Sequence, residues 1–296
     1  MPDQSSISKD VIEALLIPST ATITALLSGH GLRNTFMHDV APLKPGMKMA
    51  GPAFTMRYIP AREDLTQVPM DNLTDIQRIG IEQIETGEVL VIDARGETRA
   101  AVMGDILATR IYMRGAVGVV TDGAYRDSPV IAETGLAAYS AAMNAHTNKT
   151  IHYPSEVQVP VACGEVAVIP GDIIVGDEEG VVVVPAQLAA EVAERAAEME
   201  LKEEFIIEKI RGGASIVGTY PADEETLAEY EEWKGGDADA GSSSRVRRAV
   251  LAEQRDLCFL FLPRPTVPRL VPCEHAVGER REIASVEACV LPERRP

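Results

Sequence analysis

Cysteine, aromatic residues and long apolar runs are all scarce in this sequence. The 296 residues include four cysteines, one tryptophan and 4% aromatic residues in total. Cys163 stands alone in the body of the chain, whereas Cys258, Cys273 and Cys289 lie far apart near its end, and no Cys-x-x-Cys pair occurs. This spacing favours buried or free thiols over zinc ligands or a catalytic nucleophile.

No segment has the length and apolarity of a membrane span, and the first ten residues lack the basic and apolar parts of a signal peptide. We therefore expect a cytoplasmic protein. The net charge of -17 leaves no obvious basic face, which argues against nucleic acids and anionic membranes as partners. A hydrophobic content of 46% is enough for a sizeable core.

The histidines do not form a metal-binding pattern. His30 and His38 follow the second expected helix, and His146 and His152 lie in a polar loop, Asn144–Tyr153, that is a candidate pocket mouth. Neither pair has the spacing of metal ligands. Surface positions or structural hydrogen bonds are the favoured roles for all four.

The most informative stretch runs from Met103 to Asp127. Gly104 and Asp105 form a turn that opens a helix expected over 106–114, and an apolar strand over 117–121 leads into a polar turn, 122–127. A helix start offers unpaired backbone N–H groups to a carboxylate or phosphate. Arg126 can bind an anion through its guanidinium group, while Asp127 offers oxygen ligands to a divalent cation. For the two residues taken alone, a surface ion pair is the alternative reading.

Other patterns place further elements around this stretch. Ser8 and Ser19 are expected helix N-caps, Asp172 and Asp177 are expected turn formers, and Arg62 lies in a candidate mobile loop over 60–75. Helices are expected at 8–16, 19–27, 74–85, 129–134, 186–211 and 219–233, and strands at 49–58, 89–93 and 137–139, with strands and turns over 157–168 and 172–184. Residues 95–99 are an expected polar turn, and residues 100–103 lead directly into the Gly104–Asp105 turn.

The end of the chain differs in composition from the rest. Residues 235–244 have the composition of a flexible linker, and from Arg245 onward arginine and proline are frequent while lysine is absent. We predict a domain over 1–234, followed by a linker and a mostly disordered tail over 235–296. A frameshifted ending would have the same composition, and a basic arm that contacts RNA or another subunit is a weaker alternative.

The sequence also carries a longer signature. Asp105 is followed, after twenty residues, by Arg126-Asp127, and further matches lie at 51–55, 115–123 and 168–177. On these residues the chain resembles the metal-dependent 4-hydroxy-4-methyl-2-oxoglutarate / 4-carboxy-4-hydroxy-2-oxoadipate aldolases, whose superfamily includes RraA, a regulator of ribonuclease E activity. The resemblance covers residues 12–213.

This resemblance implies an α/β fold, with a layered α-β-β-α sandwich or barrel-like core similar to the phosphohistidine swivelling domain and with flanking N- and C-terminal helices. The glycine-rich turn at 118–123 has no histidine, so a phosphocarrier role is not expected.

The resemblance also implies a mechanism. Asp127 would bind Mg²⁺ or Mn²⁺, Asp105 would orient metal-bound water, and Arg126 would stabilise a pyruvate enolate. The backbone amides of Gly104, Asp105, Ile106 and Leu107 would hold the substrate carboxylate. The expected reaction is retro-aldol cleavage of a 4-hydroxy-2-oxo acid to pyruvate and a second oxo compound, with oxaloacetate decarboxylation as a side activity. The acceptor half stays open, and a sugar-derived acid is as conceivable as an aromatic-degradation product.

Two further expectations come from the family. Its members form trimers or hexamers, in which a glutamate from a neighbour's C-terminal helix completes the site. Here Glu203 or Glu204 would be that residue. The alternative for each is a position on a solvated, acidic helix face. Many relatives carry an aspartate in the second helix, where this chain has only the hydroxyls of Ser19–Leu26. The competing functional class is a non-enzymatic regulator that binds an RNA-degrading enzyme.

Overall fold

A computed structural model describes residues 7–65 and 71–240, with backbone only for 235–240. The strands are β1 Ala41–Pro42, β2 Met49–Pro60, β3 Val89–Asp93, β4 Ala101–Met103, β5 Gly118–Tyr125, β6 Ala137–Met143, β7 His152–Val157, β8 Val161–Cys163, β9 Val166–Val168, β10 Ile173–Gly176 and β11 Val181–Val184. The α-helices are α1 Lys9–Leu15, α2 Thr20–Gly29, α3 Ile76–Gln83, α4 Asp105–Met113, α5 Ser128–Ala132, α6 Ala189–Arg211, α7 Ile216–Thr219 and α8 Glu224–Ala240, with 3₁₀ turns η1 Asn148–Thr150 and η2 Ala186–Leu188.

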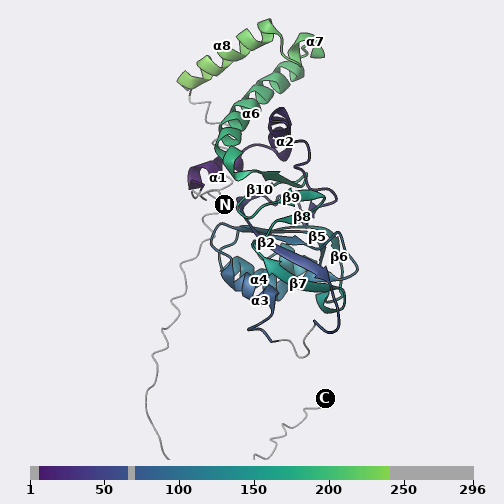
Figure 1. Ribbon diagram of the computed structural model, residues 1–296. Coiled ribbons are helices and arrows are strands. Elements are labelled where there is room, and N and C mark those ends of the chain that lie inside the picture. The colour runs from purple at the N-terminus through teal and green to yellow at the C-terminus, as the bar shows by residue number, and fades with distance from the viewer. Residues whose placement is uncertain (1–6, 66–70, 241–296) are drawn as a thin grey trace, which may run out of the picture. The chain divides into compact units, whose positions relative to one another are not determined.

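The strands form a nearly closed, barrel-like sheet with helices packed around it, as the sequence predicts. Its main path follows the order β1-β6-β5-β3-β2-β10-β11, while β4 pairs with β5, β7 pairs with β2, and β8 and β9 form a separate hairpin. The central strands β2, β3, β5 and β6 are parallel to one another. Because parallel strands require crossover connections, α3, α4 and α5 lie between them in the chain. Figure 1 shows α3 and α4 together against the sheet.

Two large hydrophobic cores hold the body of the domain together, and a smaller cluster joins the C-terminal helices. The larger one contains the inward faces of β2, β3, β5 and β6 with buried residues of α3, α4 and α5. The second is formed where α1, α2 and α6 pack on β10, β11 and Ala50. Ser8 and Ser19 cap α1 and α2 as expected, and Glu200 of α6 accepts hydrogen bonds of 2.8 Å from the backbone N–H of Ser19 and the hydroxyl of Thr22. A carboxylate on α6 therefore fixes the start of α2.

The C-terminal helices continue beyond this second core. Phe205 and Ile206 of α6 pack on Tyr230 of α8, with Trp233 beside them. Helix α8 runs to Ala240, into the segment expected to be a linker. The predicted tail lies outside the described residues.

Strand β5 is longer than the sequence predicts, and the expected polar turn at 122–127 is wrong. The strand continues to Tyr125, and all eight of its residues are buried. Asp122 is tolerated there because its carboxylate accepts hydrogen bonds from the backbone N–H groups of Ala94 at 2.7 Å and Gly96 at 2.9 Å. The sequence alone predicts a turn at Asp122, because the backbone N–H groups that satisfy its carboxylate come from a distant segment.

The expected loop over 144–153 also differs from the structure, because β7 begins at His152 and pairs antiparallel with β2. Among the described residues no single helix is long and apolar enough to cross a membrane, and α1 with α2 reaches that length and composition only as a pair bent by 108°.

Candidate active site

The signature residues meet because two parallel strands end side by side. Ala101 of β4 is in register with Ala124 of β5, and Met103 with Tyr125. The backbone N–H of Arg126 then donates to the carbonyl of Met103 at 3.0 Å. The residues that follow each strand, Gly104 on one side and Arg126 on the other, are therefore neighbours despite their separation in sequence.

Gly104 is closely approached by two side chains of the site. A Cβ atom at this position would lie 2.7 Å from Oδ2 of Asp127 and 2.9 Å from Cγ of Arg126. Gly104 is also the N-cap of α4, whose first turn contains Asp105. The Asp105 carboxylate accepts the N–H of Ile106 at 2.8 Å. That amide is already occupied, which leaves the amides of Gly104, Asp105 and Leu107 as the predicted donors to a substrate carboxylate.

Asp127 has an unusual backbone conformation, with φ 56° and ψ 29°. Aspartate and asparagine tolerate this left-handed region better than most residues do. Its side chain makes no capping hydrogen bond to α5. Instead, Oδ2 accepts a hydrogen bond of 3.0 Å from Nε of Arg126. The two side chains are 43% and 37% exposed, so an incoming ligand can reach both.

A pocket of about 220 Å³ contains all six predicted site residues. Gly104, Asp105, Ile106 and Leu107 line it together with Arg126 and Asp127. Sequence reasoning missed Gln77 and Arg78, which come from α3, because nothing distinguishes them from other polar helix residues. The loop at 144–153 does contribute to the wall, through Thr147, Asn148 and Lys149. The structure thus places the predicted residues together, while their roles stay predictions.

The chemistry of the pocket suits a hard divalent cation. The described residues contain no cluster of three or more His, Cys, Asp and Glu side chains that would hold a metal, whereas Asp105 and Asp127 both face one pocket. Mg²⁺ is commonly bound by one or two carboxylates plus substrate oxygens and water, so this donor set fits it, and a structural zinc site does not.

Glu203 does not line this pocket within the single chain. It is half-buried on α6, and burial, with the nearby Glu200, raises the pKa of its carboxyl. Its proposed role across a subunit boundary stays a prediction, as does the same role for Glu204.

The remaining candidate residues have structural partners. His30 pairs with Glu191, while His38 and His146 are exposed. The Asp172 and Asp177 carboxylates accept backbone N–H groups in their turns, as predicted. Cys163 is fully buried, and burial raises the pKa of its thiol, which makes it a poor nucleophile. Arg62 pairs with Asp64 on the surface.

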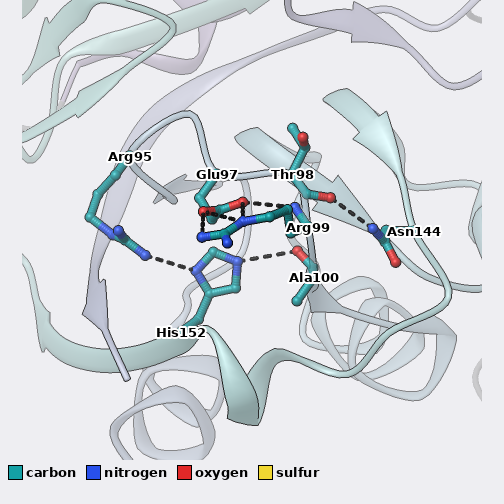
Figure 2. Close-up of polar contacts among 7 residues, drawn as sticks. All are labelled: Arg95, Glu97, Thr98, Arg99, Ala100, Asn144 and His152. Carbon is teal, nitrogen blue, oxygen red and sulfur yellow. Dashed lines mark hydrogen bonds and ion pairs between the residues drawn. The ribbon is translucent and has the colours of Figure 1, made fainter. Parts of the chain in front are cut away.

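Figure 2 shows how the turn between β3 and β4 is held. His152 is buried, with Nε2 at 3.1 Å from the carbonyl of Ala100 and Nδ1 at 3.4 Å from the guanidinium of Arg95. Burial lowers the pKa of His152, so the neutral ring donates through Nε2 and accepts through Nδ1. The amide of Asn144 donates to the carbonyl of Thr98 at 2.8 Å. These contacts fix the start of β4, the strand that presents Gly104.

The same turn predicts a pH effect on stability. Burial raises the pKa of Asp122 to about 6, from an ordinary value of 3.8. The folded protein therefore binds this proton more tightly than the unfolded chain does, and the free energy of unfolding should fall by roughly 3 kcal/mol as pH rises through this interval. Asp122→Asn cannot titrate. Denaturant unfolding measures the effect. Between pH 4 and pH 7 the free energy of unfolding of the wild type should fall by about 2–3 kcal/mol more than that of the variant. Parallel pH profiles of the two proteins would contradict the assignment.

Comparison with known proteins identifies the family. The model of the RraA-like family, described as Aldolase/RraA, matches residues 10–183. The chain belongs to the RraA-like family. The match includes the whole Asp105–Asp127 segment and leaves α6, α7 and α8 outside it.

The sequence relatives of this chain carry different names. A Halalkalibacterium halodurans protein provisionally named 4-hydroxy-4-methyl-2-oxoglutarate aldolase is 29% identical over 64% of this chain and 82% of its own length. DlpA of Legionella pneumophila is 28% identical over 72% of this chain, but the aligned region is only 34% of that longer protein.

Among solved structures, Streptomyces coelicolor RraAS2, described as an unusual member of the RNase ES inhibitor RraA protein family, is 32% identical with a TM-score of 0.61, covering 67% of this chain and 96% of its own. A Pseudomonas syringae protein without an assigned function is 29% identical with a TM-score of 0.63, covering 72% and 98%. A regulator-named protein is therefore among the fold neighbours, while the provisional aldolase name belongs to a sequence relative.

Proposed function

We propose that this RraA-like protein is a divalent-metal-dependent carbon–carbon lyase that cleaves a 4-hydroxy-2-oxo acid to pyruvate and a second oxo compound, with oxaloacetate decarboxylation as a side activity. The observation that carries the proposal is the placement of Arg126 and Asp127 against the Gly104–Asp105 helix start in one pocket. The provisional aldolase names of relatives support it.

Each side chain has a distinct task in this reaction. Nε of Arg126 is bound to Asp127, which leaves its two Nη groups to stabilise negative charge on the pyruvate oxygen as the C–C bond breaks. The amides of Asp105 and Leu107 can hold the substrate carboxylate. One oxygen of Asp105 is bound to Ile106, and the other can orient a water that removes the C4 hydroxyl proton. A Mg²⁺ or Mn²⁺ ion held by Asp127 would supply Lewis acidity at the 2-oxo acid.

The pocket also contains a lysine, which raises the question of a Schiff-base mechanism. Lys149 is exposed. Schiff-base lysines are usually desolvated, which lowers their pKa so that the neutral amine can attack a carbonyl. The exposure of Lys149 favours the metal-dependent route. Borohydride treatment with pyruvate should leave the mass of the protein unchanged, and a stable pyruvate adduct would overturn this assignment.

The direct test is pyruvate release from oxaloacetate and from 4-hydroxy-4-methyl-2-oxoglutarate, measured with Mg²⁺, with Mn²⁺ and with EDTA. Turnover that requires the metal supports the lyase. A folded protein that binds neither metal would instead favour the second candidate, a regulator that docks on an RNA-degrading enzyme. The likeness to RraAS2 is the observation behind that alternative.

We also propose a homotrimer or homohexamer in which Glu203 or Glu204 approaches a neighbour's pocket. Sedimentation equilibrium tests the assembly, and a monomer would remove this role for both glutamates.

A further inference from the structure

The pocket has a second wall, formed outside the Asp105–Asp127 segment. Arg78 comes from α3, and Asn148 and Lys149 come from η1. Within the described residues neither Arg78 nor Lys149 forms an ion pair, although the chain carries 45 acidic residues against 28 basic ones. Two cations without carboxylate partners in one pocket are available to a ligand.

Gln77 anchors this wall. Its side chain is buried, with 3% exposed. Nε2 donates to the Tyr58 hydroxyl at 2.6 Å and to the carbonyl of Val102 at 2.8 Å, while Oε1 accepts from Nδ2 of Asn148 at 3.3 Å. Both polar atoms of the amide are therefore used, and a satisfied buried network of this kind holds its members in one arrangement.

The carbonyl of Val102 links the two walls. It accepts hydrogen bonds from Gln77, from the Tyr58 hydroxyl at 3.3 Å and, at the limit of hydrogen-bond distance, from Nδ2 of Asn148 at 3.5 Å. Val102 lies two residues before Gly104 in the chain. Asn148 is thus held against the same strand that presents the Gly104–Asp105 helix start, so the network sets the spacing between the walls.

We propose that Lys149 binds the acceptor half of the substrate and that Asn148, anchored by Gln77, positions it. This inference rests on the proposed lyase function. Arg126, Asp127 and the helix start hold the pyruvate half, which leaves the second wall for the remainder of the molecule. The pocket, of about 220 Å³, extends beyond the Gly104–Leu107 and Arg126–Asp127 residues to Arg78, Asn148 and Lys149. The N–H donors of Lys149 and Arg78 select an acceptor half rich in carboxylate or hydroxyl oxygen over an alkyl one.

The two halves of the site can be assayed separately. A site that stabilises the pyruvate enolate during cleavage must also form it from pyruvate: a methyl C–H bond breaks, water takes the proton, the electron pair moves to the enolate oxygen, and D₂O returns a deuteron to carbon. Proton NMR follows this exchange, which needs only the pyruvate half. Cleavage of 4-hydroxy-4-methyl-2-oxoglutarate needs both halves, and 4-hydroxy-2-oxopentanoate offers an alkyl acceptor for comparison.

Lys149→Met and Asn148→Ala are the test variants, because Lys149 is exposed and Asn148 half-buried, so both should fold. We expect kcat/KM for 4-hydroxy-4-methyl-2-oxoglutarate to fall about tenfold to a hundredfold, and pyruvate exchange to fall about threefold or less. The preference over 4-hydroxy-2-oxopentanoate should shrink in Lys149→Met. Lys44→Met and Asn34→Ala remove a surface lysine that pairs with Glu133 and an exposed asparagine, and should match wild type in both assays.

Equal losses in exchange and cleavage would mean that the second wall is only structural, and no loss in either would mean that it does not contact substrate. A wild-type protein that exchanges pyruvate but prefers the alkyl acceptor, or cleaves neither compound, would also overturn the inference. Failure of the proposed function is recognised separately, because wild type would then show neither metal-dependent exchange nor decarboxylation.

Discussion

Asp127→Asn is expected to lower metal-dependent pyruvate release at least about a thousandfold and to weaken Mn²⁺ binding. The variant removes one negative charge from the proposed ligand. Asparagine tolerates the left-handed backbone of this position (φ 56°) about as well as aspartate does, so the fold should be retained. Calorimetric titration with Mn²⁺, followed by the pyruvate assay, separates the loss of metal from the loss of structure.

Glu133→Gln is the matched control, because it neutralises an exposed carboxylate just beyond α5 that pairs with Lys44. It should bind Mn²⁺ and release pyruvate as wild type does. Unchanged Mn²⁺ affinity in Asp127→Asn would remove Asp127 from the metal site and, with it, the central assumption of the lyase mechanism.

Gly104→Ala is expected to reduce kcat/KM about a hundredfold or more through a single added methyl group. Its Cβ would lie 2.7 Å from Oδ2 of Asp127 and 2.9 Å from Cγ of Arg126, so both side chains must move. Alanine can adopt the backbone conformation of Gly104, with φ -125° and ψ -171°. The expected loss of activity therefore comes from displaced side chains and not from a strained backbone. Displacement of catalytic groups by about 1 Å commonly costs this much activity.

Gly29→Ala provides the comparison, because its added Cβ meets no atom within 4 Å and it lies at the end of α2. It should keep full activity and equal or greater thermal stability. If Gly104→Ala were as active as Gly29→Ala, the contact between the helix start and the Arg126–Asp127 pair would have no catalytic importance.

Most elements of the fold could be predicted because local signals agree with tertiary packing. Ser8 and Ser19 cap helices as their sequence context indicates, and strand β3 has the predicted bounds, Val89–Asp93. The site residues could be located because Gly104 and Asp105 form a turn that opens a helix, Arg126-Asp127 come soon after a strand, and their spacing resembles that of a known family. Because β4 pairs parallel with β5, the residues that follow the two strands lie side by side.

The errors have a common physical origin, because long-range hydrogen bonds are invisible in local sequence. Asp122 looks like a turn residue until the backbone amides of Ala94 and Gly96 are seen to satisfy it inside β5. Gln77 looks like any polar helix residue until its amide is found between Tyr58 and Val102. In both cases the partners lie on other elements, and only the folded chain brings them together.

The presence of two cores has a consequence for how such a protein can diversify. The pocket is built on elements of the larger core, whereas α1, α2 and α6 belong to the second core on β10 and β11. Terminal helices can therefore be lengthened, exchanged or remodelled by evolution without repacking the residues beneath Gly104 and Arg126. A lineage with this architecture can acquire new assembly contacts at its ends while the packing beneath Gly104 and Arg126 is inherited unchanged, which is compatible with enzyme-named and regulator-named relatives sharing one scaffold.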